Sequence, residues 1–196
     1  MITFVDGKLA YKDPTQVVIE INGIGYEVKI TLNTYSALKD AEHYKLHTYL
    51  HIKEDSHTLY GFAELEEKMI FLNLISISGI GPSTGLIMLS SLSPHEIKSA
   101  IVNGDVQLIQ GVKGIGSKTA QRVILELKDK IARDELIEKA VDLSSNSYNT
   151  IKNEALSALI TLGINKSLAE KKIDMLLRDN EDLALEELIK LALKNT

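Results

Sequence analysis

Apolar and polar residues alternate along roughly the first sixty residues, a pattern that indicates half-buried β-strands. The alternating stretches are rich in β-branched and aromatic side chains and comprise MITFVDGKLAYK (1–12), TQVVIEI (15–21), GYEVKI (25–30), KLHTYLHI (45–52) and HTLYGF (57–62). A short helical or irregular piece is expected near residues 33–41. Five short strands in so short a span favour a small closed barrel of the oligonucleotide/oligosaccharide-binding (OB) type, although a different small barrel would show the same pattern.

The period of the apolar residues becomes helical from Glu64 onward. An apolar stripe along one helix is predicted from Leu65, Met69, Leu72 and Ile75 or Ile77. Ser93 followed by Pro94 is typical of a helix start, because Ser caps the free N–H groups and Pro fits the first turn. Further helices are predicted over 83–91, 94–103, 105–110 and from 117 through the 130s.

A polar stretch divides the remaining chain. The sequence DLSSNSYNT (142–150) has almost no apolar side chain and is the best linker candidate. After it, three short amphipathic helices are predicted, separated at Leu162-Gly163-Ile164-Asn165 and at Arg178-Asp179-Asn180. The predicted fold is therefore multidomain α+β, with a five-stranded OB-type barrel over 1–63, a helical domain over 64–140, a flexible linker over 141–150 and a three-helix domain over 151–196.

The composition excludes several classes of function. Only 5% of the 196 residues are aromatic and none is Trp, which disfavours a lectin-like or aromatic-caged binding surface. Cysteine is absent, so disulfides and thiolate metal sites are excluded and a reducing compartment fits. No apolar run approaches membrane-spanning length, and the N-terminus lacks an export signal. We therefore expect a cytoplasmic protein with no membrane partner.

The sequence Gly-Ile-Gly occurs twice at equivalent places, in SISGIGPSTGLIM (76–88) and in GVKGIGSKTAQRV (111–123), 35 residues apart. Each copy stands where a helix is expected to begin, and a helix start offers unpaired N–H groups and partial positive charge to a phosphate. Glycine permits the tight turn and the close approach, while the isoleucine is expected to turn inward. A single copy is equally well explained as a tight turn between helices, but the duplication favours phosphate binding.

Positive charge gathers around the second copy although the whole chain carries a net charge of −5. From residue 113 to residue 133 there are six basic residues against two acidic ones. Lys118, Thr119 and Arg122 lie in the first turns of the predicted helix, where they would add charge around the same phosphate. On charge alone, a solvated helix face with i,i+4 ion pairs is the preferred explanation of the pattern. The barrel does not share the excess, because residues 1–63 contain six basic and eight acidic side chains.

Enzyme functions fit the sequence less well. The run from Gly111 to Thr119 nearly spells a nucleotide-binding P-loop, but Ser117 separates the last glycine from Lys118 and turns that lysine about 100° around the helix. No acidic cluster beside the repeats suits two-metal nuclease chemistry. His47 and His51 share a strand face at a separation of roughly 13 Å, too far for one metal ion. We expect no catalytic residue, no metal and no cofactor.

The whole chain resembles the RuvA family of bacterial Holliday-junction-binding proteins. The resemblance rests on the doubled helix-hairpin-helix pattern together with NGIGYEV (22–28) and EDSHTLYGF (54–62), in this order along the chain. Matched residue by residue, it implies DNA-phosphate binding by two sets: Gly79, Ile80, Gly81, Ser83 and Thr84 in the first hairpin, and Gly114, Ile115, Gly116, Lys118, Thr119 and Arg122 in the second. Glu54 and Asp55 match an acidic pin at the junction centre, although an ordinary polar β-turn also explains them.

The resemblance also implies partners. It predicts a homotetramer that presents a flat basic face to four-way junction DNA, with one or two tetramers on a junction. It predicts that the C-terminal domain recruits a RuvB-type hexameric ATPase through an apolar surface, and it admits a RuvC-type junction nuclease as a further partner. Leu159, Leu162 and Ile164 are candidates for this surface, although for any one of them a place in the core is the better explanation. A generic helix-hairpin-helix repair module that binds nicks or ends without forming a tetramer is the alternative.

Overall fold

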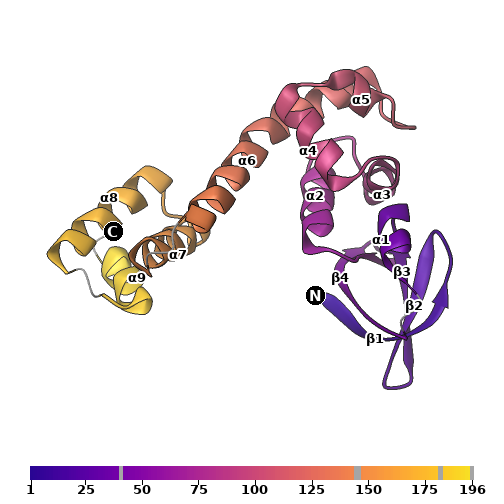
Figure 1. Ribbon diagram of the computed structural model, residues 1–196, viewed down its shortest axis with the longest axis horizontal. Helices are drawn as coiled ribbons and strands as arrows, with labels where there is room; N and C mark the ends of the chain where they lie inside the picture. The colour runs from indigo at the N-terminus through magenta and orange to yellow at the C-terminus, as the bar shows by residue number, and fades with distance from the viewer. Residues whose placement is uncertain (40–41, 144–146, 181–182, 195–196) are drawn as a thin grey trace. The chain divides into compact units, whose positions relative to one another are not determined.

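The computed structural model describes residues 1–39, 42–143, 147–180 and 183–194 and divides the chain into two compact units, Met1–Arg133 and Asp134–Thr196. The first unit begins with a closed barrel whose strands follow the order β1-β2-β3-β5-β4, with β1 pairing β4 to close it (Figure 1). The strands are β1 (Phe4–Lys12), β2 (Gln16–Ile21), β3 (Ile24–Ile30), β4 (His43–Ile52) and β5 (His57–Phe62). This order, with β3 and β5 parallel, confirms the predicted five-stranded OB-type barrel.

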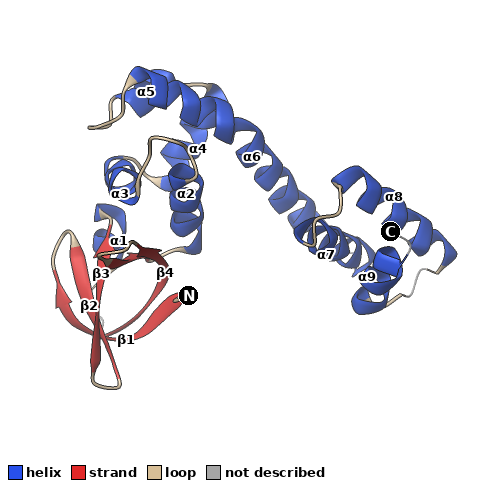
Figure 2. Cartoon of the chain, turned by 180° about the vertical axis from the view of Figure 1, so that it is seen from behind, coloured by secondary structure: helices blue, strands red, loops and turns tan. Residues whose placement is uncertain are grey.

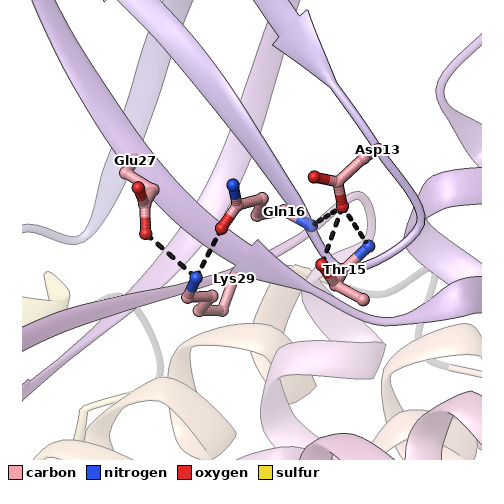
Figure 3. A network of polar contacts seen from close by, with 5 residues as sticks. All are labelled: Asp13, Thr15, Gln16, Glu27 and Lys29. Atoms are coloured by element: carbon pink, nitrogen blue, oxygen red, sulfur yellow. Dashed lines mark hydrogen bonds and ion pairs between the residues drawn. The ribbon is translucent and has the colours of Figure 1, made fainter.

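The strands follow the predicted alternation because every second side chain enters the barrel. Val17 and Ile19 of β2 and Val28 and Ile30 of β3 are all buried, and they pack with Val5, Leu46 and Leu59. The turn from β1 to β2 is held by Asp13, whose carboxylate accepts hydrogen bonds from the hydroxyl and N–H of Thr15 and from the N–H of the next residue (Figure 3). The Thr15 hydroxyl is the main reason that the pKa of Asp13 lies below its usual value.

The short helix α1 (Leu32–Ala37) fills the gap between β3 and β4 and ties the barrel to the helices that follow. Thr31 caps α1 by accepting a hydrogen bond from the N–H of Thr34 at 2.9 Å. The hydroxyls of Thr31 and Thr34 also donate to the two carboxylate oxygens of Glu67 at 2.5 and 2.6 Å. Glu67 is only 3% exposed, so α1 and the next helix share a buried polar contact.

Five helices complete the described part of the first unit and pack around one core (Figure 2). Tyr60 and Phe62 of the barrel belong to that core, so the barrel and these helices are joined by continuous apolar packing. The predicted cap at Ser93 is confirmed as a full capping box with Glu96. The helices are α2 (Leu65–Ile75), α3 (Pro82–Ser91), α4 (Pro94–Asn103), α5 (Val106–Gln110) and α6 (Ser117–Leu143), the last of which extends past Arg133.

The stripe predicted for α2 is wrong at its start and confirmed at its end. Leu65 and Met69 are 53% and 49% exposed, whereas Leu72 and Ile75 pack against the core and Ile77 is buried. Phe71 and Leu74, which the predicted stripe leaves out, are fully buried. Phe71 sets the orientation of the helix because it packs against Phe62 with ring centroids 4.8 Å apart. This orientation of α2 also buries Glu67, whose carboxylate accepts hydrogen bonds from the hydroxyls of Thr31 and Thr34.

The second unit consists of α7 (Ser147–Thr161), α8 (Lys166–Asp179) and α9 (Leu185–Lys194) around their own core, which includes Ala155, Ile173 and Leu188. The three predicted helices are therefore present. The linker predicted over 141–150 overlaps helix at both ends, because polar residues without Gly or Pro do not by themselves stop a helix. Residues 144–146 lie outside the described residues, and the linker stays a prediction.

Candidate nucleic-acid interface

The two Gly-Ile-Gly turns have the same backbone geometry. Gly79 and Gly114 have φ values of 98° and 89°, in the left-handed region that favours glycine. The helices that follow begin at equivalent residues, with the N–H of Gly85 donating to the carbonyl of Gly81 and the N–H of Ala120 donating to that of Gly116, both at 2.9 Å. The sequence repeat is therefore a structural repeat in which α2 and α3 form one hairpin and α5 and α6 form the other.

The isoleucines anchor the turns, as predicted. Ile80 and Ile115 are 4% and 6% exposed, and both belong to the core of the first unit. Their N–H groups donate to the carbonyls of Ile77 and Val112 at 3.0 and 3.1 Å. Because these two donors are already used inside the protein, the expectation that Ile80 and Ile115 themselves bind phosphate is corrected: they hold the turn from within.

The other main-chain N–H groups of the two turns are left without an acceptor, because no hydrogen bond seen among the described residues uses them. In the first turn these donors belong to Gly79, Gly81, Ser83 and Thr84, and in the second to Gly114, Gly116, Ser117, Lys118 and Thr119. The four glycines are exposed, and a Cβ built on Gly81, Gly114 or Gly116 would meet no protein atom within 4 Å. Ser117 was missed from the sequence, although its position directly after the capping glycine marks it as a first-turn donor.

The two hairpins lie against each other. A Cβ at Gly79 would lie 3.9 Å from the hydroxyl oxygen of Thr119. The guanidinium of Arg122 donates from Nη1 to the carbonyl oxygen of Ser78 at 3.1 Å, and its Nε lies 3.6 Å from a carboxylate oxygen of Glu126. Residues from both copies of the repeat therefore form one continuous site.

Lys113 and Lys118 bring positive charge to the second turn, and Lys128 and Lys130 lie further along α6. Within the described part of the chain, all four are exposed and none of them forms an ion pair. Arg122 is the one basic side chain of residues 113–133 seen in an i,i+4 pair, among those that the structure describes. Pairing along the helix therefore accounts for Arg122 alone, while a solvated face fits the exposed lysines.

Glu54 and Asp55 form the tip of the turn between β4 and β5. The turn is closed by the N–H of Lys53, which donates to the carbonyl of Ser56 at 2.8 Å. Both acidic side chains are exposed, and within the described residues neither forms an ion pair. The residues thus form a tight connection between the two strands that presents two carboxylates to solvent.

The candidates for partner binding in the second unit separate by burial. Leu159 is 1% exposed and packs in the core of that unit, which is the explanation that the sequence favours for it, so it is no longer a candidate for a partner surface. Ile164 is half-buried against the same core. Leu162, next to Gly163 at the end of α7, is 60% exposed and stays available.

The structural context does not fit a P-loop. That motif requires a strand before its glycine-rich loop, whereas the helix α5 precedes Gly111. Among the described residues, no cluster of His, Asp and Glu is arranged to hold a metal ion. None of the described helices has the length and apolar character needed to cross a bilayer.

The comparisons with known proteins agree with this geometry. The family description "RuvA N terminal domain" matches residues 1–61, "SAM-like Helix-hairpin-helix tandem" matches 71–129, and "RuvA, C-terminal domain" matches 150–195. A relative from Cytophaga hutchinsonii is 58% identical, with 99% of each chain covered. The chain belongs to the RuvA family. RuvA relatives from Christiangramia forsetii (99% of each chain covered) and Flavobacterium psychrophilum (100% of each) are 52% and 50% identical, and all three carry the name Holliday junction branch migration complex subunit RuvA.

Proposed function

We propose that this chain is the junction-binding subunit of a Holliday junction branch migration complex, acting in DNA recombination and repair. The observation that carries the proposal is the pair of adjacent turns whose exposed N–H groups have no acceptor among the described residues. Membership of the RuvA family, whose relatives bear that name, supports the same function.

Each hairpin is suited to hold one phosphate of the DNA backbone. Main-chain donors at a helix start stabilise an anion through hydrogen bonds and through the helix dipole, and they contact no base edge. Lys118 adds a charge beside the second set. Binding is therefore expected to be independent of sequence and to weaken steeply with salt.

Two phosphate sites on one chain hold one duplex arm, so four copies would match the four arms of a junction. We therefore include a homotetramer, with one or two tetramers on a junction, in the proposal. In such an assembly the carboxylates of Glu54 and Asp55 would meet at the crossover and repel the phosphates there. That repulsion would keep the strands apart and the junction open.

The second unit is proposed to recruit the ATP-driven partner, a RuvB-type hexamer, with Leu162 as a contact; a RuvC-type nuclease is a further partner that we include. The subunit itself is proposed to be non-catalytic, to need no cofactor and to act in the cytoplasm. Branch migration would then draw its free energy from ATP hydrolysed by the partner.

The deciding experiment is a band-shift titration of a four-way junction against linear duplex of equal length at two salt concentrations. We expect at least about tenfold tighter binding of the junction, equivalent to about 1.4 kcal/mol, and a loss of affinity with salt for both DNAs. Equal affinity for the two DNAs would instead support the generic helix-hairpin-helix module. ATP turnover by the isolated chain above background would contradict the non-catalytic role.

A further inference from the structure

The two hairpins differ in the charge that they contribute. At the 35-residue offset, Lys113, Lys118 and Arg122 of the second repeat correspond to Ser78, Ser83 and Ile87 of the first. The sequence has no Lys or Arg between Lys68 and Lys98, so the first turn and α3 bring no cation of their own. Lys68, near the start of α2, donates to the carbonyl of Thr3 in the barrel. A phosphate bound at the first turn would depend on main-chain donors unless another element supplied charge.

Arg122 supplies positive charge to the first turn, because its side chain extends from α6 to that turn. Its Nη1 donates to the carbonyl oxygen of Ser78, the residue directly before Gly79, across 44 residues of sequence. The carbonyl oxygen carries partial negative charge beside donors that suit an anion, and the guanidinium offsets it. The Thr119 hydroxyl oxygen is near the same place, 3.9 Å from where a Cβ of Gly79 would stand, so side chains of α6 lie beside the first turn.

The Arg122 guanidinium has N–H donors that neither Ser78 nor Glu126 uses. Of its five N–H groups, one faces Glu126 and one faces Ser78, which leaves three in the same rigid plane. A lysine carries the same charge but has no planar fork, so it cannot hold Ser78 and Glu126 in this geometry while offering donors to a phosphate. Arg122 and Lys118 are therefore different in kind, although both are basic residues of the same helix.

We propose that Arg122 is a positioning residue that fixes the spacing of the two hairpins and provides the turn of the first one with positive charge. The inference deepens the proposed function, since the spacing matters only if both turns hold phosphates. The sequence pattern places Arg122 with the second hairpin, whereas the proposal gives it a role in both hairpins.

The first test uses amide hydrogen exchange on the full chain without DNA. In Arg122→Lys and Arg122→Gln, exchange of the Ile80 amide should rise at least about fivefold, while that of the Ile115 amide changes by less than about twofold. Glu126→Gln and Lys118→Gln, which keep the contact with Ser78, are the matched controls and should leave Ile80 unchanged. The barrel amide of Ile19 reports whether each variant has folded.

The second test measures affinity for a four-way junction at several salt concentrations. Arg122→Lys should bind at least about fivefold more weakly with an unchanged salt slope, whereas Lys118→Gln should reduce the slope by about 0.9 through loss of one phosphate contact. Unaltered Ile80 exchange in Arg122→Lys, or raised exchange without lost affinity, would overturn the proposal. If the unaltered chain shows no junction binding, the proposed function fails, and the exchange result still decides whether Arg122 braces the hairpins.

Discussion

At the scale of single residues, the absence of a side chain matters most at Gly116. A Cβ at this position would meet no protein atom within 4 Å, so the space beside it is free for a ligand. Gly116 also caps α6, and its carbonyl accepts the first helical hydrogen bond from Ala120. A side chain at residue 116 would therefore leave this main-chain hydrogen bond intact, but it would fill the open space beside the turn.

Gly116→Glu is expected to weaken junction binding at least about tenfold, because the carboxylate would occupy the phosphate position and repel it. The midpoint of thermal unfolding should change little, since the added atoms enter open space. Band shifts and thermal unfolding monitored by circular dichroism check the two parts.

Gly116→Ala is the matched control, because it adds a methyl group without charge and should weaken binding far less. Normal junction binding by Gly116→Glu would show that the second turn does not face DNA.

At the scale of elements, the sequence pattern did not indicate the buried polar contact between α1 and α2, in which Thr31 and Thr34 donate to Glu67. Burial raises the pKa of the Glu67 carboxyl, and the hydroxyl donors of Thr31 and Thr34 offset only part of that rise. The folded state therefore favours the protonated form of Glu67 more than the unfolded chain does. The resulting stabilisation is fully present below the pKa of the unfolded chain and is lost as the pH rises through the folded value.

Acidification from pH 7 toward the usual pKa of a glutamic acid should therefore stabilise the unaltered protein relative to Glu67→Gln, which stays neutral at every pH. The difference between their unfolding midpoints should shift by a few degrees in favour of the unaltered protein as the pH falls. Thermal scans at four or five pH values measure this difference.

Glu20→Gln, at an exposed position of β2 that forms no ion pair among the described residues, is the matched control for a change in net charge. A midpoint difference between Glu67→Gln and the unaltered protein that stays constant with pH would show that Glu67 does not titrate in this range.

At the scale of the whole molecule, the two units have separate cores. The cores of the first unit hold the barrel and both hairpins, while Ala155, Ile173 and Leu188 belong to the core of the second. The residues proposed to contact DNA all lie in Met1–Arg133. DNA binding and partner binding are therefore expected to be separable.

Deletion of residues 151–196 should keep the affinity for a four-way junction within about threefold and abolish stimulation of a RuvB-type ATPase. Band shifts and ATPase assays with the partner measure the two effects. The full-length Leu162→Glu variant is a second arm, since it changes an exposed side chain at the proposed contact without removing the unit. Loss of junction binding on deletion would contradict the separation.

The sequence by itself determined the elements and the repeat. Strand alternation indicated the barrel, and the Ser93-Pro94 start and both Gly-Ile-Gly turns follow from local rules that involve only a few neighbouring residues. The inward direction of Ile80 and Ile115 was predictable for the same reason. These features depend on backbone geometry near each residue, which short patterns record.

Only the tertiary structure decided which face of α2 is buried and where Arg122 donates. Both depend on contacts beyond the local turn: Phe62 of the barrel packs on Phe71 of α2, and Ser78 lies 44 residues from Arg122. Which of Leu159, Leu162 and Ile164 is buried was likewise decided by the packing of the three helices. A pattern along the chain carries the period of a helix but not the identity of what packs against it.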